Sequence, residues 1–307
     1  MSALRTMMAV LLCGALAGGC ASEPKAIGPL VEVASGLAFA EGPAADRAGH
    51  VYFTDQPNDR IWRWDADSGE VAVWREPSGR ANGMEFDAEG RLIVCADGAN
   101  ELRRLSMDGS SETLVDSFGG SLLNGPNDAW VHADGSVYFT DPWYRRAHWK
   151  DHPVERRRSD PKPEQPVEGV YRVGPDGGEP TLVVDDLTRP NGIVGSPDGE
   201  TLYVADIGAG KTFAYPIREH GMLGPGRLLV ALGSDGMAVD AAGNLYLTGD
   251  GVHIVSPAGV KLGHIAVPRP WTSNVAFAGT DRRTLLITAG SSVFAVRMSV
   301  PGPAPGR

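Results

Sequence analysis

Six residues with an oxygen-bearing side chain, acids or amides, recur at one position of a repeated pattern. Each lies 13 or 14 residues before the small residue that ends a short apolar run, as in Val51–Thr54 or Leu92–Cys95. A single Asn-Gly pair is explained best as a turn before a strand. Six such residues in one register, two of them carboxylates, favour a convergent site. We call them the ring residues: Glu41, Asn82, Asn127, Asn191, Asp235 and Asn274.

The side chains of the ring residues select a kind of ligand. Carboxylate and amide oxygens without histidine or cysteine are hard ligands, which suit Ca²⁺ better than Zn²⁺. Glu41 and Asp235 would balance a divalent charge, and amide oxygens and water would complete the roughly six to eight positions that Ca²⁺ prefers. We expect a Ca²⁺ site, with another divalent cation such as Zn²⁺, Mg²⁺ or Mn²⁺ as the alternative. An ion that only stabilises the fold would suit the same ring.

The elements that must position these residues repeat along the chain. Strand-like runs end at residues 54, 95, 140, 205, 248 and 288, in steps of 41, 45, 65, 43 and 40 residues. Turns rich in Asp and Gly, such as Asp87–Gly90, precede the runs and permit the positive φ values of tight hairpins. A period of about 40 residues with four short strands is typical of a propeller blade. The sequence therefore predicts an all-β, six-bladed β-propeller whose innermost strands start at the ring residues.

The two ends of the repeated region complement each other. The sixth unit has three strands, and Pro29–Val33 can supply its outer strand, which would close the ring without an unpaired edge. We expect one domain over residues 27–300 and a flexible tail at 301–307. The step of 65 residues indicates an insertion at 142–168 with seven Lys or Arg. It is expected to form either a lid over one mouth or a solvated loop.

Composition excludes several classes of function. The 307 residues contain 28 Lys and Arg against 38 Asp and Glu, a net charge of −10, and no basic stripe that would bind nucleic acid. Of the 3 cysteines only Cys95 lies in the repeated region, so neither a disulfide framework nor a thiolate metal site is expected there. No Gly-x-Ser-x-Gly nucleophile motif occurs.

The N-terminal segment has the pattern of an export signal. Arg5 is followed by the apolar run 7–17 and by Gly18-Gly19-Cys20, a run too short for a permanent membrane span. Residues 16–20 resemble a bacterial lipobox, in which Cys20 would carry lipid, and ordinary cleavage is the alternative. The sequence thus predicts a signal segment at 1–20 and an exported protein. It would be either a cell-envelope lipoprotein, held on the membrane only through a lipid anchor at Cys20, or a periplasmic protein.

The segments around the ring residues resemble a known family. AEGPAAD, GPNDAWVHADGSVYFTDPWY, EGVYRV, LTRPNGIVGSPDGETLYVAD and SDGMAVDAAGNLYLT are similar, in this order, to the gluconolactonase family that includes regucalcin (senescence marker protein). The likeness extends from about residue 31 to residue 298. It implies a metal, usually Ca²⁺, held by Glu41, Asn191 and Asp235, with Asn127 beside it contacting the metal or the substrate. It also implies that Asp235 acts as general base.

The resemblance implies a hydrolase that opens a small-molecule lactone. The metal would polarise the ring carbonyl, and the metal or Asp235 would activate the attacking water. The side chains expected around the substrate are Asn127 and Asn191 at the carbonyl, Asn82 and Asn274 farther out, and Trp143 and Tyr144 over one face of a sugar-like ring.

Two alternatives to this function stay open. One is an envelope binding or scaffold propeller with a structural ion, since one fold hosts many functions. The other is an organophosphate or ester hydrolase on the same metal site. Gly125 stands where regucalcin has an Arg for the sugar lactone, and bacterial gluconolactonases also have a small residue there, so the analogy shifts toward them.

Overall fold

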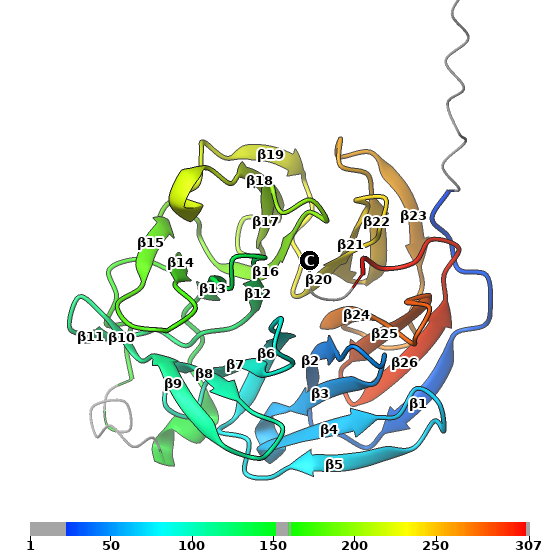
Figure 1. Cartoon of the computed structure of the whole chain (residues 1–307), viewed down its shortest axis with the longest axis horizontal. Coiled ribbons are helices and arrows are strands. Elements are labelled where there is room, and N and C mark those ends of the chain that lie inside the picture. The colour runs from blue at the N-terminus through cyan, green and yellow to red at the C-terminus, as the bar shows by residue number, and fades with distance from the viewer. Residues whose placement is uncertain (1–22, 152–158, 160, 305–307) are drawn as a thin grey trace, which may run out of the picture.

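Six four-stranded antiparallel sheets follow one another around a central axis (Figure 1). The computed structural model describes residues 23–151, 159 and 161–304. From the axis outward, the first sheet contains β2 (Ala40–Ala45), β3 (Val51–Asp55), β4 (Arg60–Trp64) and β5 (Val71–Arg75). The second contains β6 (Ala81–Phe86), β7 (Leu92–Ala96), β8 (Glu101–Leu105) and β9 (Ser111–Val115).

The next three sheets repeat this order. The third contains β12 (Ala129–Val131), β13 (Val137–Asp141), β14 (Gly169–Val173) and β15 (Thr181–Val184). The fourth contains β16 (Pro190–Gly195), β17 (Thr201–Asp206), β18 (Lys211–Pro216) and β19 (Arg227–Val230). The fifth contains β20 (Met237–Val239), β21 (Leu245–Gly249), β22 (Gly251–Val255) and β23 (Lys261–Ile265).

The sixth sheet joins the two ends of the chain. It contains β24 (Asn274–Ala278), β25 (Thr284–Ala289), β26 (Ser292–Arg297) and, as its outer strand, β1 (Val31–Ser35). Because β1 pairs with β26, the ring closes as predicted and no blade lacks an outer strand. The predicted six-bladed β-propeller is confirmed.

Several short elements connect or extend the strands of the propeller. A small hairpin is formed by β10 (Ser117–Phe118) and β11 (Ser121–Leu122). The 3₁₀ turns are η1 (Gln56–Asn58), η2 (Ala147–Asp151) and η3 (Glu219–Gly221). No helix among the described residues is long and apolar enough to cross a membrane. The predicted signal and lipobox, residues 1–20, lie outside that part of the chain.

The prediction of a flexible tail at 301–307 needs correction for its first residues. The Gly302 amide donates to the Arg282 carbonyl oxygen (2.7 Å), and the Ala241 amide donates to the Pro301 carbonyl oxygen (2.8 Å). Gly302 is buried against Phe277, where an added Cβ would lie 2.4 Å from the Phe277 Cβ. The packed fold therefore extends beyond residue 300, because a glycine lets the chain pass close to the sixth sheet.

Neighbouring sheets pack face to face through apolar side chains. Tyr52 and Ile61 of the first sheet pack with Leu92 and Val94 of the second in one buried cluster. Cys95 is also fully buried and free, and burial raises the pKa of its thiol. It therefore serves as a small apolar core residue.

In some sheets a threonine near the end of the second strand bonds to the inner strand of the next sheet. The Thr54 hydroxyl donates to the Asn82 carbonyl oxygen (3.2 Å), and the Thr140 hydroxyl donates to the Asn191 carbonyl oxygen (2.8 Å). Inner strands approach so closely that a Cβ on Gly42 would lie 1.9 Å from the Asn82 oxygen. The glycine that follows Glu41 is thus required by this close approach and not by a hairpin turn.

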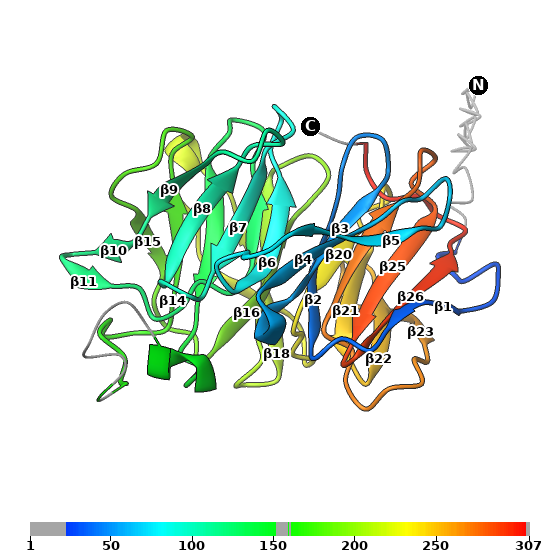
Figure 2. The ribbon, with the colours of Figure 1, turned by 90° about the horizontal axis from the view of Figure 1, so that it is seen from below.

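The propeller has two faces, seen edge-on in Figure 2. We call the lower one in that view, which carries η1 and η2, the ring face. The opposite one, the turn face, carries the Asp- and Gly-rich turns and the C-terminal segment.

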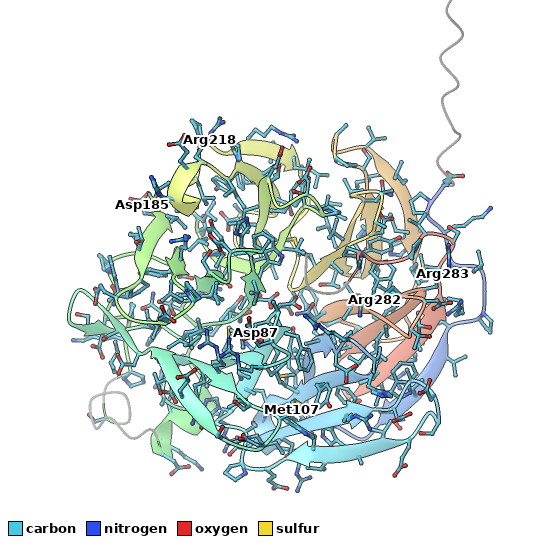
Figure 3. All side chains as sticks on the ribbon, viewed as in Figure 1. Asp87, Met107, Asp185, Arg218, Arg282 and Arg283 are labelled. Carbon is cyan, nitrogen blue, oxygen red and sulfur yellow. The ribbon has the colours of Figure 1, made fainter. Side chains whose placement is uncertain are left out.

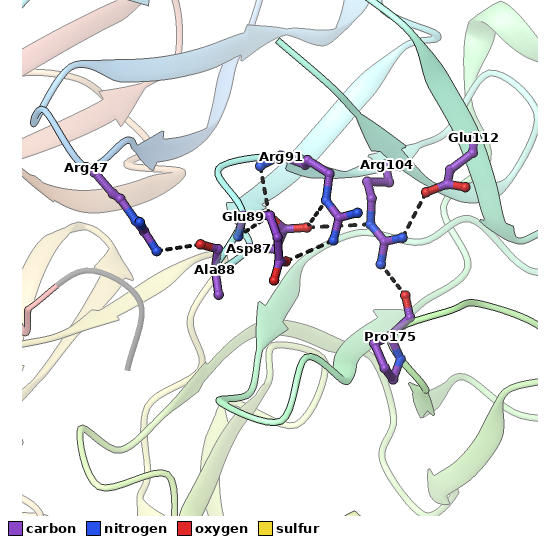
Figure 4. A network of polar contacts seen from close by, with 8 residues as sticks. All are labelled: Arg47, Asp87, Ala88, Glu89, Arg91, Arg104, Glu112 and Pro175. Atoms are coloured by element: carbon purple, nitrogen blue, oxygen red, sulfur yellow. Dashed lines mark hydrogen bonds and ion pairs between the residues drawn. The ribbon is translucent and has the colours of Figure 1, made fainter.

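Charged side chains link three sheets on the turn face (Figure 4). Arg47 of the first sheet donates to the Ala88 carbonyl oxygen of the second. Arg104 lies beside Asp87, pairs with Glu112 at 2.8 Å and donates to the Pro175 carbonyl oxygen of the third sheet. These contacts fix the relative positions of the sheets that carry the ring residues.

Candidate functional site

A cavity of about 360 Å³ opens on the ring face where the inner strands begin. Five of the six ring residues line it, which confirms that one register brings them together around the axis. The full lining is Phe39, Glu41, Gln56, Asn82, Asn127, Tyr144, Arg146, Arg189, Asn191, Ile207, Gly208, Asp235 and Trp271.

The sixth ring residue, Asn274, points away from this cavity. Its Nδ2 donates to Glu41 Oε2 (3.0 Å), and the residue lines a second cavity of about 390 Å³ on the turn face. Strand β24 pairs regularly with β25 from Asn274 onward, whereas bulges follow the ring residues of β2, β6 and β16. Asn127 and Asp235 precede the ladders of β12 and β20, so Asn274 is the one ring residue held opposite a partner, Thr288, in an unbroken ladder.

Hydrogen bonds hold Asp235 from two sides. Its Oδ1 accepts from Asn191 Nδ2 (2.8 Å), and its Oδ2 accepts from Trp271 Nε1 (2.6 Å). Asn191 Nδ2 also donates to the Tyr144 hydroxyl (3.1 Å). With the amide nitrogen used in this way, the buried Asn191 Oδ1 has no hydrogen-bond partner in the described structure. Such an oxygen is a ready ligand for a cation.

The two acids of the cavity share an unfavourable electrostatic environment. Burial raises the pKa of Glu41 well above its usual range, and the nearby Asp235 raises it further. Burial also raises the pKa of Asp235 to about 6. A buried and a partly buried carboxylate close enough to repel each other, with amide oxygens around them, fit a hard divalent cation because it would neutralise both. The residues predicted to hold the metal, Glu41, Asn127, Asn191 and Asp235, therefore suit that group.

The insertion at 142–168 contributes to this cavity. Tyr144 and Arg146 line it, and Trp149 of η2 is 1% exposed and donates through Nε1 to the Asp97 carbonyl oxygen (3.3 Å). The described part of the insertion is thus docked on the ring face. Trp143 does not line the cavity, and its ring lies 5.0 Å from that of Trp149.

Besides Tyr144, four cavity residues with a hydrogen-bonding side chain have no counterpart in the repeated pattern. Gln56 belongs to η1, and Trp271 lies in the loop between β23 and β24. Arg146 comes from the insertion and Arg189 from the loop before β16. Loops vary in length between blades, so no spacing could reveal them. The clustering of basic residues in the insertion was the one available signal.

Within the described part of the chain, two other groups of potential metal ligands lie outside this cavity: Asp250, His253 and His264, and His50, Asp65 and Asp67. In the second group, the Asp65 carboxylate already accepts from the Asp67 and Ser68 amides, and His50 Nδ1 accepts from the Ala66 amide. The Asp65 and His50 atoms of that group that could bind a metal are therefore already used as hydrogen-bond acceptors within a turn.

Comparisons with known proteins identify the family to which this chain is similar. Residues 39–291 match the model of the SMP-30/Gluconolactonase/LRE-like region. A gluconolactonase from Zymomonas mobilis is 30% identical over 304 residues, covering 89% of this chain and 82% of that protein. The lactonohydrolase oryL of Aspergillus oryzae is 28% identical, covering 76% of this chain and 60% of that protein.

A solved structure is similar as well. A gluconolactonase from Xanthomonas campestris superposes with a TM-score of 0.78 at 31% identity, over 88% of this chain and 89% of that one. The matched region contains every ring residue and all six inner strands. The chain therefore belongs to the SMP-30/Gluconolactonase/LRE-like family.

Proposed function

We propose that this protein opens lactone rings by hydrolysis in the ring-face cavity, with Ca²⁺ held by Glu41, Asn191, Asp235 and Asn127. The observation that carries the proposal is the convergence of two repelling carboxylates and an unpartnered amide oxygen on one cavity. Lactone hydrolysis is also the activity named for the relatives described above. A purely structural ion would not need an open cavity beside it.

A bound cation would supply a Lewis acid for the lactone carbonyl. Asp235 would accept a proton from the attacking water, because with a pKa near 6 its carboxylate is mostly ionised at neutral pH. Asn191 and Trp271 hold this carboxylate in place through both of its oxygens. As the ring C–O bond breaks, the proton passes from Asp235 to the leaving alkoxide, which gives the open hydroxy acid.

The remaining side chains would bind and orient the substrate. The Asn82 and Asn127 amides reach the cavity wall and can hydrogen-bond to a carbonyl or hydroxyl group. Tyr144, bonded to Asn191 through its hydroxyl, covers the cavity from the insertion side and limits access of water.

A pH-stat panel of aldono-lactones and acyl lactones on the chelated mature chain, with and without added Ca²⁺, tests this function. We expect Ca²⁺-dependent hydrolysis of at least one aldono-lactone. Asn82→Ala is expected to weaken it only mildly, since Asn82 is not among the proposed ligands. Full activity in the presence of excess chelator would exclude the cation, and inactivity toward every lactone would exclude the reaction.

We also propose that the chain is exported and acylated at Cys20. The pattern Gly18-Gly19-Cys20 and the polar residues after it support this. A diacyl anchor partitions strongly into membranes, at about 0.8 kcal/mol per buried CH₂. The native protein should therefore sediment with membranes, and Cys20→Ser should move it to the soluble envelope fraction with the same melting temperature. A soluble, unacylated native chain with another mature N-terminus would contradict acylation.

A further inference from the structure

Two arginines line the same side of the ring-face cavity. Arg146 and Arg189 place their guanidinium carbons 4.8 Å and 5.1 Å from the centre of the Tyr144 ring. Tyr144 bonds in turn to Asn191, so this cationic wall adjoins the proposed reaction centre directly. The two residues come from different sheets and approach one tyrosine, which places two positive charges beside one part of any bound substrate.

Each arginine is oriented by a carboxylate that does not itself line the cavity. Arg146 Nε lies 2.7 Å from Oδ2 of Asp97, which is 1% exposed and also accepts from Gln56 Nε2 (3.1 Å). Arg189 Nε lies 3.5 Å from Glu168 Oε2. Within the described residues, the terminal guanidinium nitrogens of both arginines have no hydrogen-bond partner, and each guanidinium group has one ion-pair partner. Planar guanidinium groups held in this way are suited to bidentate binding of an anion.

Once a cation neutralises Glu41 and Asp235, the charged side chains that remain on the cavity wall are positive. The charged lining of the cavity consists, within the described part of the chain, of Glu41, Asp235, Arg146 and Arg189. A divalent cation would balance Glu41 and Asp235. Asp97 and Glu168 pair with Nε of Arg146 and Arg189 from outside the cavity, so the charged groups that still face a substrate are the two guanidinium groups. An anionic substituent would form an ion pair with them, which the hydroxyl groups of a neutral sugar lactone cannot do.

We infer that Arg146 and Arg189 form an anion subsite, and that the substrate is a lactone with a negatively charged substituent away from its ring carbonyl. This inference rests on the proposed lactone hydrolysis. The substituent is a carboxylate, phosphate or sulfonate group, since each offers coplanar oxygens to a guanidinium. Arg146 and Arg189 bind it, while the ring residues receive the lactone carbonyl.

Matched substrates test the subsite by kinetics. D-glucono-1,5-lactone, its 6-phosphate ester and a glucarolactone with a free carboxylate are compared with wild-type protein, R146Q and R189Q. At least one anionic lactone should exceed the neutral one in kcat/KM by about tenfold or more, mainly through KM. Each Arg→Gln variant should remove most of that advantage and change the neutral reaction by less than about threefold. The ester and the carboxylate identify which anion the subsite prefers.

Two kinds of control separate charge from folding. R146K and R189K keep the charge and should recover part of the preference for the anion. R218Q removes a positive charge at the exposed outer edge of the fourth sheet, labelled in Figure 3, and should leave all rates unchanged. Equal kcat/KM for neutral and anionic lactones, or equal losses for both in R146Q and R189Q, would overturn the subsite.

Binding of products gives a readout that does not depend on turnover. In calorimetry the chain should bind 6-phosphogluconate more tightly than gluconate, and R146Q and R189Q should abolish the difference. If no lactone is hydrolysed, the proposed reaction fails, but an arginine-dependent preference for 6-phosphogluconate would still establish the anion subsite. Similar binding of both products by wild-type protein would exclude it.

Discussion

Strand β20 has an aspartate near each of its ends, and the two carboxylates lie in opposite surroundings. Asp240, on the turn face, is fully buried and accepts from the Ala242 and Asn244 amides, the Asn244 side chain and the Tyr246 hydroxyl. Asp235, on the ring face, is held by two side chains beside a second buried acid, and burial raises its pKa to about 6. The charge of Asp240 is stabilised by hydrogen bonds of the fold itself, whereas the charge of Asp235 would be stabilised by a bound cation.

The same contrast separates acids in the turns from the two acids of the ring-face cavity. On the turn face, backbone amides of residues 67 and 68 and the Ser68 side chain lower the pKa of Asp65 to about 2, and hydrogen bonds from serines lower the pKa values of Asp108 and Asp198. On the ring face, burial raises the pKa values of Glu41 and Asp235. Peptide donors thus distinguish the acids of the turns from those of the ring-face cavity, but the face alone does not. Asp55 and Asp206, at ring-face strand ends, accept backbone amides, whereas burial raises the pKa values of Glu85 and Asp128 beside the turn-face cavity.

The largest effect is expected from Asp235→Asn. The change keeps size and an amide oxygen but removes the negative charge and the proton acceptor. Lactone hydrolysis should fall by about 10²- to 10⁴-fold, while the chelated variant should be at least as stable as the chelated wild type. Initial rates and thermal melts measure both. An active variant would remove Asp235 from the mechanism.

Asp240→Ala should give the reverse result. It leaves two backbone amides and the Tyr246 hydroxyl without their buried acceptor, at an expected cost of about 3 kcal/mol in the free energy of unfolding. Activity per folded molecule should not change, since Asp240 is outside the cavity. Urea unfolding and rates at saturating substrate separate the two quantities. Unchanged stability would contradict the role given to the turn-face carboxylates.

The stability of the chelated protein should depend on pH through the ring acids. Because the pKa of Asp235 is raised from 3.8 to about 6 in the folded chain, its contribution is fully present below about pH 4 and is lost as pH rises through 6. We expect a loss on the order of 2 kcal/mol, which Ca²⁺ should reverse at neutral pH. Melts of wild type and Asp235→Asn at pH 4.5 to 8 measure it. Equal slopes for both proteins would refute this assignment.

Trp271→Phe tests the hydrogen bond that stabilises the Asp235 carboxylate. Loss of the Nε1 donor should raise the pKa of Asp235 in the chelated protein, since this bond lowers it. The acid limb of the rate profile should move to higher pH, and the rate near pH 6 should fall by about tenfold. A lower rate with an unmoved acid limb would assign Trp271 to substrate packing instead.

Arg91→Gln should have the smallest effect. Arg91 pairs with Asp87 and with the exposed Glu89 on the turn face, and its side chain is 35% exposed (Figure 4). Such ion pairs contribute under about 1 kcal/mol, so stability should fall slightly and activity not at all. A loss comparable to that of Asp240→Ala would mean that ion pairs, and not amide donors, hold the turn face together.

The sequence was sufficient to predict those features of the fold and site that depend on the repeated spacing of the blades. Strand order, closure by β1 and the register of five cavity residues all follow from one repeated spacing. The direction of Asn274 could not be predicted, because the spacing does not show that this residue is already paired in the regular ladder of its sheet. Trp271 and Arg189 come from loops whose lengths differ between blades. The packing of the first tail residues on the sixth sheet depends on the close approach of Gly302 to Phe277, which no repeated spacing indicates.

The central claim is that Glu41 and Asp235 of the ring-face cavity form a cation site and that an amide-bonded turn carboxylate such as Asp240 does not. Calorimetric titration of the chelated mature chain with Ca²⁺ tests it most directly. Wild type and Asp240→Asn should bind one Ca²⁺ each with similar affinity, whereas Glu41→Gln and Asp235→Asn should lose most of the binding. No heat of binding in wild type, or unchanged binding in both Glu41→Gln and Asp235→Asn, would contradict the claim.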